Sequence, residues 1–276
     1  MKNTLRMQLL PVVLSVVTCL VLVGLLWIEI LAINQFSSEP IVVHIGMLDV
    51  LIGMSIYLKT SVDFAIVIGR MMDKNPGLKG RVGIEIGTAL GNAAGTMAIL
   101  LLWAFAKNIS WLLAIMIVLA ALVLLRLAQD SLEDVDRLAG IHRGLHGFAK
   151  RFDALLVGVN KVFDPVLSRL VPSRALNIKT ATTITALLAT AFTIPFILGL
   201  DDFAGYVPLF NVVNVFGFAV GVFVGHALLN ICLFAAPSTT VRVVKNPLIA
   251  FGGSLVFVGL ALWGVYEALK LIVHIR

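Results

Sequence analysis

Apolar residues dominate the chain in long runs that short polar stretches separate. Runs of about 18 residues or more are long enough to cross a bilayer as helices. The pattern therefore predicts an all-α polytopic membrane protein with about seven transmembrane helices. The expected spans cover residues 10–33, 43–72, 82–106, 109–127, 180–206, 210–236 and 248–273.

Composition supports this class. Of the 276 residues, 60% are hydrophobic and only 13% are charged, whereas soluble domains carry about 25% charged residues. The net charge of +6 is not accompanied by a nucleic-acid-binding motif, so no nucleic acid is expected as a partner. Cys19 and Cys232 both lie inside apolar runs, which argues against a disulfide framework. No resident cofactor is expected.

The basic residues fall on alternate sides of the expected spans. Most of them lie in residues 70–81, 126–179 and 242–245. By the positive-inside rule these segments are cytoplasmic, which predicts a cytoplasmic N-terminus and an outer C-terminus. We expect a multi-pass protein of a bacterial plasma (inner) membrane, with the lipid bilayer as its immediate partner.

Residues 128–179 form the only long stretch outside the expected spans. Apolar residues recur there at helical spacing, with basic residues opposite them. The pattern predicts an amphipathic cytoplasmic linker on the anionic inner leaflet, and we favour a linker over a regulatory domain. The apolar positions are Phe148, Phe152, Leu155, Val159, Phe163, Val166 and Leu170.

The two flanking parts resemble one another. VDFAI (62–66) aligns with DDFAG (201–205), which pairs Asp63 with Asp202. GTALGNAAGT (87–96) aligns with GVFVGHALLN (221–230). Because the charge rule orients the two parts oppositely, they are expected to form two inverted three-helix repeats, as in secondary transporters. The expected division is 1–42 (first helix and outer loop), 43–127 (repeat A), 128–179 (linker) and 180–276 (repeat B).

The first helix of each repeat is expected to be interrupted. Residues 43–72 would reach about 45 Å as one helix, against about 30 Å of hydrocarbon. The polar cluster KTSVD (59–63) marks the break in repeat A, and GLDD (199–202) marks it in repeat B. Interrupted helices at matching positions point to a transport site.

Residues around these breaks supply candidate ligands for a cation. Carboxylates, amides and hydroxyls are the hard oxygen donors that Ca²⁺ and Mn²⁺ prefer, and a histidine favours a transition metal. In the third span, glycines at every fourth position form a second stripe that would let another helix approach closely. The candidate metal ligands are Asp63, Glu85, Thr88, Asn92, Asp201, Asp202, His226 and Asn230, with Lys59 as a gating or ion-pairing residue.

Several of these candidates also have a purely structural interpretation. Asp63 and Lys59 lie one turn apart and would form a stabilising ion pair. Glu85 would cap its helix. Asp201 would face the outer water, and His226 would be a packed or hydrogen-bonded core histidine.

The interrupted, acidic repeats DDFAGY (201–206) and VDF (62–64) resemble those of the lysine-exporter superfamily. That group includes the calcium:cation antiporter-2 exchangers and the tellurium- and cadmium-resistance membrane proteins. The resemblance implies export of a divalent cation of the Mn, Ca or Cd type, with protons as the counter-ion. It also implies that acidic residues of both repeats, above all Asp63 and Asp202, bind the ion.

Other functions remain open at this stage. The same architecture would serve an exporter of a small organic solute such as an amino acid. A membrane-embedded lipid-acting enzyme is a weaker alternative, since no catalytic motif of the H-E-x-x-H or G-x-S-x-G type occurs, and we expect no enzyme activity. A structural partner subunit and a homodimeric assembly are also kept open.

Overall fold

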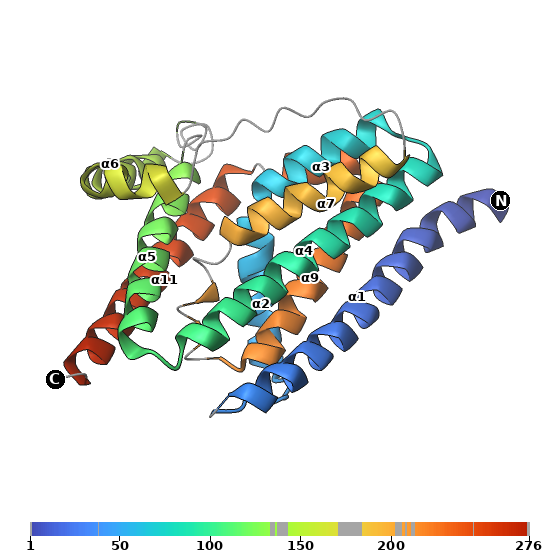
Figure 1. The fold of residues 1–276 in the computed structure, drawn as a ribbon. Coiled ribbons are helices and arrows are strands. Elements are labelled where there is room, and N and C mark those ends of the chain that lie inside the picture. Colours follow the sequence, from blue (N-terminus) through green and yellow to red (C-terminus); the bar gives the residue numbers. More distant parts are fainter. Residues whose placement is uncertain are drawn as a thin grey trace. The chain divides into compact units, whose positions relative to one another are not determined.

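The computed structural model describes residues 2–37, 39–132, 136, 143–170, 184–201, 206, 207, 209, 210, 213–244 and 246–274. Every regular element in these ranges is a helix, which confirms the all-α prediction (Figure 1). Five helices are long and apolar enough to cross a membrane, and they match the expected spans one, three, four, six and seven. They are α1 (Lys2–Phe36), α4 (Leu78–Ala106), α5 (Ser110–Asp130), α9 (Val215–Ala235) and α11 (Pro247–His274).

The expected second span is broken at the predicted place. It consists of α2 (Met47–Thr60) and α3 (Val62–Lys74), which are bent by 67° relative to one another at Ser61. The Thr60 hydroxyl lies 3.2 Å from both the Ile56 and the Tyr57 carbonyl oxygens. Side-chain bonds of this kind compete with the helical ladder and bend helices. The prediction of a break within residues 59–63 is therefore confirmed.

The described part of the expected fifth span is a single helix. It corresponds to α7 (Ile184–Asp201), whose described apolar stretch is Thr185–Phe196. Pro195 lies inside this helix. The backbone of α7 stays helical through Asp201, and residue 202 lies outside the described part of the chain, so the predicted break at 199–202 stays a prediction.

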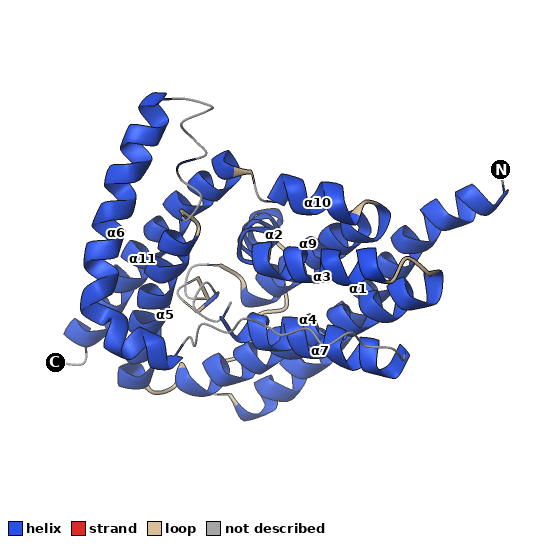
Figure 2. Ribbon diagram, turned by 90° about the horizontal axis from the view of Figure 1, so that it is seen from above, coloured by secondary structure: helices blue, strands red, loops and turns tan. Residues whose placement is uncertain are grey.

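The chain forms two compact units. Unit 1 contains α1, α2, α3, α7, α9, the short α10 (Pro237–Val244) and nearly all of α4, while unit 2 contains α5, α11 and α6 (Arg143–Leu170) (Figure 2). Each unit thus takes helices from both expected repeats.

Glycines allow two pairs of helices in unit 1 to pack at very close range. A Cβ on Gly221 of α9 would lie 2.2 Å from the Val50 carbonyl oxygen of α2, and one on Gly225 would lie 3.2 Å from that of Met54. Since real Cβ atoms do not approach so closely, the helices touch backbone to backbone at Gly221. Only glycine permits this approach.

The α4–α7 pair repeats that arrangement. A Cβ on Gly87 would lie 2.6 Å from the Leu188 carbonyl oxygen, and one on Gly91 would lie 2.1 Å from that of Phe192. The expectation that the glycine stripe of the third span admits another helix is confirmed for these two positions. In both pairs, two glycines four residues apart face two carbonyls four residues apart.

In unit 2, α5 and α11 pack side by side, and the Ser254 hydroxyl donates to the Ala128 carbonyl oxygen at 2.8 Å. Helix α6 lies across this pair, close to the C-terminal end of α5 (Figures 1 and 2). The buried Asn160 amide fixes it there by donating to the Leu125 carbonyl oxygen and to Oε1 of Gln129.

Candidate functional site

Four polar side chains of α4 lie on one buried face. Glu85 and Thr88 are completely buried, and Asn92 and Thr96 are nearly so. Their spacing of three and four residues places them above one another, as predicted. The alternative that Glu85 caps its helix is wrong, because α4 begins at Leu78, about two turns earlier.

His226 of α9 is hydrogen-bonded through both ring nitrogens. Its Nε2 lies 2.9 Å from Nδ2 of Asn230, and its Nδ1 lies 2.6 Å from the hydroxyl oxygen of Tyr57 on α2. A side-chain amide nitrogen only donates, so Nε2 accepts from Asn230. In neutral His226 the proton is therefore on Nδ1, which donates to Tyr57.

Asn230 connects His226 to the polar face of α4. Its Nδ2 also donates to the Thr88 hydroxyl oxygen at 3.1 Å, and that hydroxyl donates to the Glu85 carbonyl oxygen at 2.9 Å. Ser15 of α1 completes the set by donating to Oε1 of Glu85. The resulting buried network joins four helices of unit 1. Its members are Ser15, Tyr57, Glu85, Thr88, His226 and Asn230.

Three polar atoms in or beside the buried network have no hydrogen-bond partner within the described part of the chain. They are Oε2 of Glu85, Oδ1 of Asn230 and Nδ2 of Asn92. Buried polar atoms are normally paired, because leaving one unpaired costs about 1–3 kcal/mol. Two acceptors and one donor are thus available to a ligand, a proton or water.

No protein-family model, curated protein or solved structure matches the chain significantly. Its function must therefore be inferred from the site itself.

Three of the four carboxylates expected to hold the cation fall where side chains are not described. Asp63 lies in the first turn of α3 and Asp201 is the last residue of α7, but the side chains of both, and all of Asp202, lie outside the described structure. Among the described residues, no three His, Cys, Asp or Glu side chains group closely enough to hold a metal ion. The metal site and the ion pair between Asp63 and the half-buried Lys59 accordingly stay predictions.

Two members of the buried network were not anticipated from the sequence. Ser15 belongs to the first helix, which lies outside the expected repeats, and Tyr57 precedes the predicted break. Each is a polar side chain in an otherwise apolar run, which is the one signal that could have marked it.

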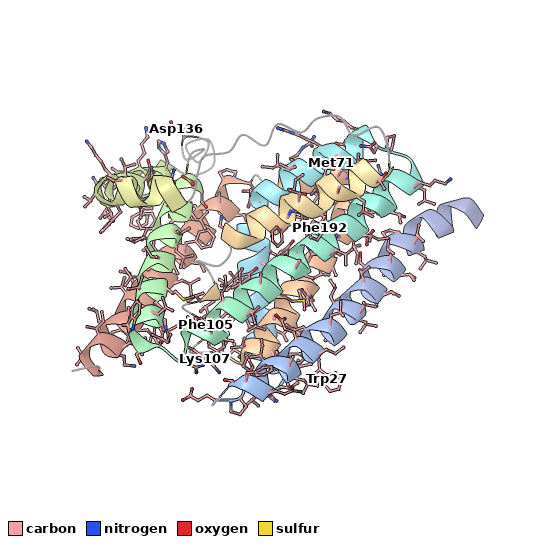
Figure 3. The ribbon with its side chains drawn as sticks, viewed as in Figure 1. Trp27, Met71, Phe105, Lys107, Asp136 and Phe192 are labelled. Atoms are coloured by element: carbon pink, nitrogen blue, oxygen red, sulfur yellow. The ribbon has the colours of Figure 1, made fainter. Side chains whose placement is uncertain are left out.

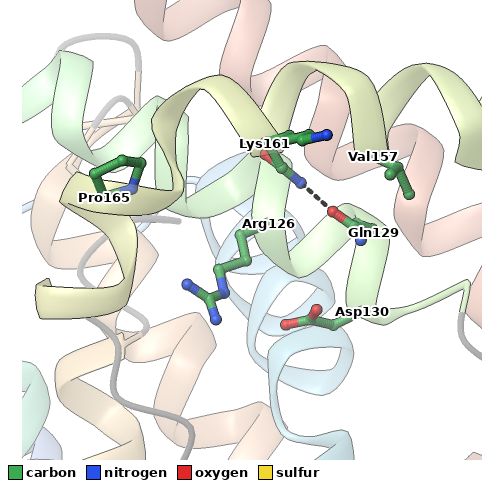
Figure 4. A pocket seen from close by; sticks show the side chains of 7 residues that line it. Arg126, Gln129, Asp130, Val157, Lys161 and Pro165 are labelled. Atoms are coloured by element: carbon green, nitrogen blue, oxygen red, sulfur yellow. Dashed lines mark hydrogen bonds between the residues drawn. The ribbon is translucent and has the colours of Figure 1, made fainter.

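A pocket of about 370 Å³ lies between α5 and α6 in unit 2 (Figure 4). Its lining includes Arg126, Asp130 and Lys161 together with Asn160 and Gln129, which hold the two helices together. Charges of both signs are mixed there, and the Asn160 amide nitrogen already donates to Oε1 of Gln129. We assign the pocket to the joint between the helices rather than to a ligand site.

Replacing Tyr57 by phenylalanine tests the bond that joins α2 to the buried network. The Nδ1 proton of His226 would lose its acceptor, so the variant is expected to be less stable by about 0.6 to 1.7 kcal/mol. These figures are the average and the largest energies measured for hydrogen bonds between membrane helices. The measurement is the unfolding midpoint of the purified protein in detergent. Tyr266→Phe on the exposed surface of α11 is the control and should leave the midpoint unchanged; an equal effect of both variants would contradict the assigned bond.

Proposed function

We propose that the protein is an integral membrane secondary transporter that exports a divalent metal cation in exchange for protons, through a site between two inverted repeats. The observation that carries the proposal is the reciprocal helix packing. The second helix of repeat B (α9) packs on the first helix of repeat A (α2), and α4 of repeat A packs on α7 of repeat B in the same manner. The third helices, α5 and α11, pack on each other.

An exchange of the two repeats would map the α2–α9 contact onto the α4–α7 contact, and the α5–α11 contact onto itself. Contacts related in this way are expected from inverted repeats with a common axis, and such repeats place their substrate site at their interface. The buried network lies beside the glycine contacts, because His226 follows Gly225 and Thr88 follows Gly87. This supports the buried network as part of the transport path.

The glycine contacts also provide a register for the two first helices. They match Val50 with Leu188 and Met54 with Phe192. Asp63 follows Met54 by the same number of residues as Asp201 follows Phe192. This register therefore pairs Asp63 with Asp201, whereas sequence similarity pairs it with Asp202, one position later. We therefore propose Asp63 and Asp201 as the equivalent carboxylates of the two repeats.

Protons and metal would compete for the same carboxylates. Asp63, Asp201 and the buried Glu85 would be ionised when they bind the cation and neutral when they carry protons, which couples the two movements. Amide and hydroxyl groups of Asn92, Thr88 and Asn230 would supply neutral ligands.

A small organic solute is the second candidate substrate, and one observation favours it. The atoms without partners around the buried network comprise one donor, Nδ2 of Asn92, and two acceptors, on Glu85 and Asn230. A metal ion needs only acceptors, whereas a solute such as an amino acid presents both donors and acceptors.

Thermal stability in the presence of Mn²⁺, Ca²⁺, Cd²⁺, Zn²⁺ or Mg²⁺ distinguishes a metal cation from an organic solute as the substrate. A ligand at 100 times its dissociation constant adds about 2.7 kcal/mol, which is readily measured as a raised unfolding midpoint. We expect one metal to stabilise the protein, and we expect Asp63→Asn and Asp201→Asn to abolish the effect. Acidic pH should weaken it, because protons compete with the metal.

Asp202→Asn is the matched control for the register. It should retain most of the metal response if Asp201 is the counterpart of Asp63. Loss of the response in Asp202→Asn alone would instead restore the pairing by sequence similarity. No response to any metal in the parent protein would contradict the metal proposal and favour the organic solute.

A further inference from the structure

Helix α6 presents three distinct faces. One face, with Ala149, Leu156 and Asn160, is buried. The buried residues recur at intervals of seven and four residues, so they form a narrow band along the helix. Asn160 in this band bonds to α5. The band therefore accounts for how α6 is held, and it leaves most of the helix surface uncovered within unit 2.

The second face is apolar and exposed. Phe148, Leu155 and Val162 are 56%, 61% and 72% exposed, although each has a large apolar side chain. We call this face the apolar stripe; its members are Phe148, Phe152, Leu155, Val159, Val162 and Phe163. An apolar face of this length would not remain in water on a stable helix.

The apolar stripe continues onto the surface of α11. The Phe148 ring packs edge-on against that of Phe251, with their centroids 6.1 Å apart. Leu248 and Leu255, about one turn to either side of Phe251, are exposed as well. Because α11 is apolar enough to span a membrane, this exposed surface is the one that acyl chains would contact.

The third face is polar. Lys150, Arg151 and Lys161 are exposed there. Near the start of the helix, Asp136 accepts hydrogen bonds from His146 and Lys150, which hold the pKa of this carboxyl below its ordinary value (Figure 3). Lys161 also lines the α5–α6 pocket. The polar face is therefore suited to water and to lipid headgroups.

We propose that α6 is an interfacial helix whose apolar stripe is inserted among the acyl chains of one leaflet, with anionic phospholipid headgroups along its basic face. Three features support a bilayer as the occupant. The helix lies across the α5–α11 pair and not along it, the stripe is continuous with the exposed apolar surface of α11, and the flanking charges are mostly basic. The proposal requires that α5 and α11 span the membrane, but it does not depend on what the protein transports.

Site-directed spin labelling of the whole protein in vesicles tests this. Single cysteines would replace Leu155 and Val162 in the apolar stripe, in a background where Cys19 and Cys232 are alanine. Ala154→Cys and Lys161→Cys are the matched controls. Each directly precedes a test position in the chain and is exposed, but lies on the polar face of the helix. Collision rates with oxygen, which concentrates in lipid, and with a water-soluble nickel chelate are measured for each label.

We expect labels at 155 and 162 to collide severalfold more with oxygen than with nickel, and labels at 154 and 161 to show the reverse. The difference in collision rates between the two pairs of labels should be smaller in vesicles of phosphatidylcholine alone than in vesicles that also contain phosphatidylglycerol. Nickel access at all four positions would overturn the proposal, because α6 would then be a linker in water. Protection of 155 and 162 from both reagents would also overturn it, since a second copy or another protein would then cover the stripe. A contrast independent of phosphatidylglycerol would overturn the anionic-lipid part.

Discussion

Replacing Gly91 or Gly221 by alanine is expected to destabilise the protein severely. The added methyl would lie 2.1 Å from the Phe192 carbonyl oxygen in the first variant and 2.2 Å from that of Val50 in the second. Both obstacles are helix backbone, so neither can move aside without separating the helices. Overpacking of a fitted interface costs about 1–3 kcal/mol, and backbone overlap belongs at the upper end of that range or above it.

The measurement is the unfolding midpoint in detergent together with the yield of folded protein. Gly252→Ala and Gly259→Ala in α11 are matched controls, since nothing lies within 4 Å of the added carbon at either position. These controls should be neutral or stabilised by up to about 1 kcal/mol, the difference in helix propensity between glycine and alanine. If Gly91→Ala were as stable as Gly252→Ala, the close α4–α7 contact would be refuted. Similar losses in Gly91→Ala and Gly221→Ala would support equivalent roles in two repeats.

Replacing Glu85 by glutamine is expected to abolish proton-coupled transport with little change in stability. Glutamine keeps a carbonyl oxygen that accepts the hydrogen bond from Ser15, and its volume is nearly the same. It cannot release or bind a proton, however, so a step that depends on changing the charge at this position would stop. Intramembrane carboxylates with such a role are typical of proton-coupled carriers.

The assay is proton release from inverted vesicles on addition of Mn²⁺ or Cd²⁺, followed with a pH-sensitive dye. We expect at least a tenfold loss for Glu85→Gln. Glu267→Gln is the control, because Glu267 forms an exposed ion pair with Lys270 at 3.3 Å and should have no role in coupling. Full activity in Glu85→Gln would show that Glu85 serves only to hold α1 against α4. Destabilisation without loss of activity would lead to the same conclusion.

The sequence was most informative where structure is local. Apolar runs located the five long helices, the polar cluster at 59–63 located the break at Ser61, and spacing placed Glu85 and Asn92 on one buried face. In each case the physical cause lies within one or two helical turns of the residue concerned.

The sequence was least informative about which helices are neighbours. Helical periodicity identifies a face but not the partner that the face meets. The hydrogen bond between Tyr57 and His226 therefore could not be anticipated, although both residues are plain in the sequence. The contribution of Ser15 was missed for the same reason, since a helix outside the expected repeats was not considered beside Glu85.

The packing of α9 on α2 has a consequence for biosynthesis. Gly53 of α2 meets the backbone of α9 at Phe218, so its partner is made only after the intervening chain has been translated. At about 5–20 residues per second this interval lasts about 10 to 30 seconds. During that time the face of α2 that carries Gly53 and the Tyr57 hydroxyl lacks its final neighbour. The insertion machinery, lipid or water must shelter that face until α9 arrives, so the N-terminal half depends on the completion of a much later segment.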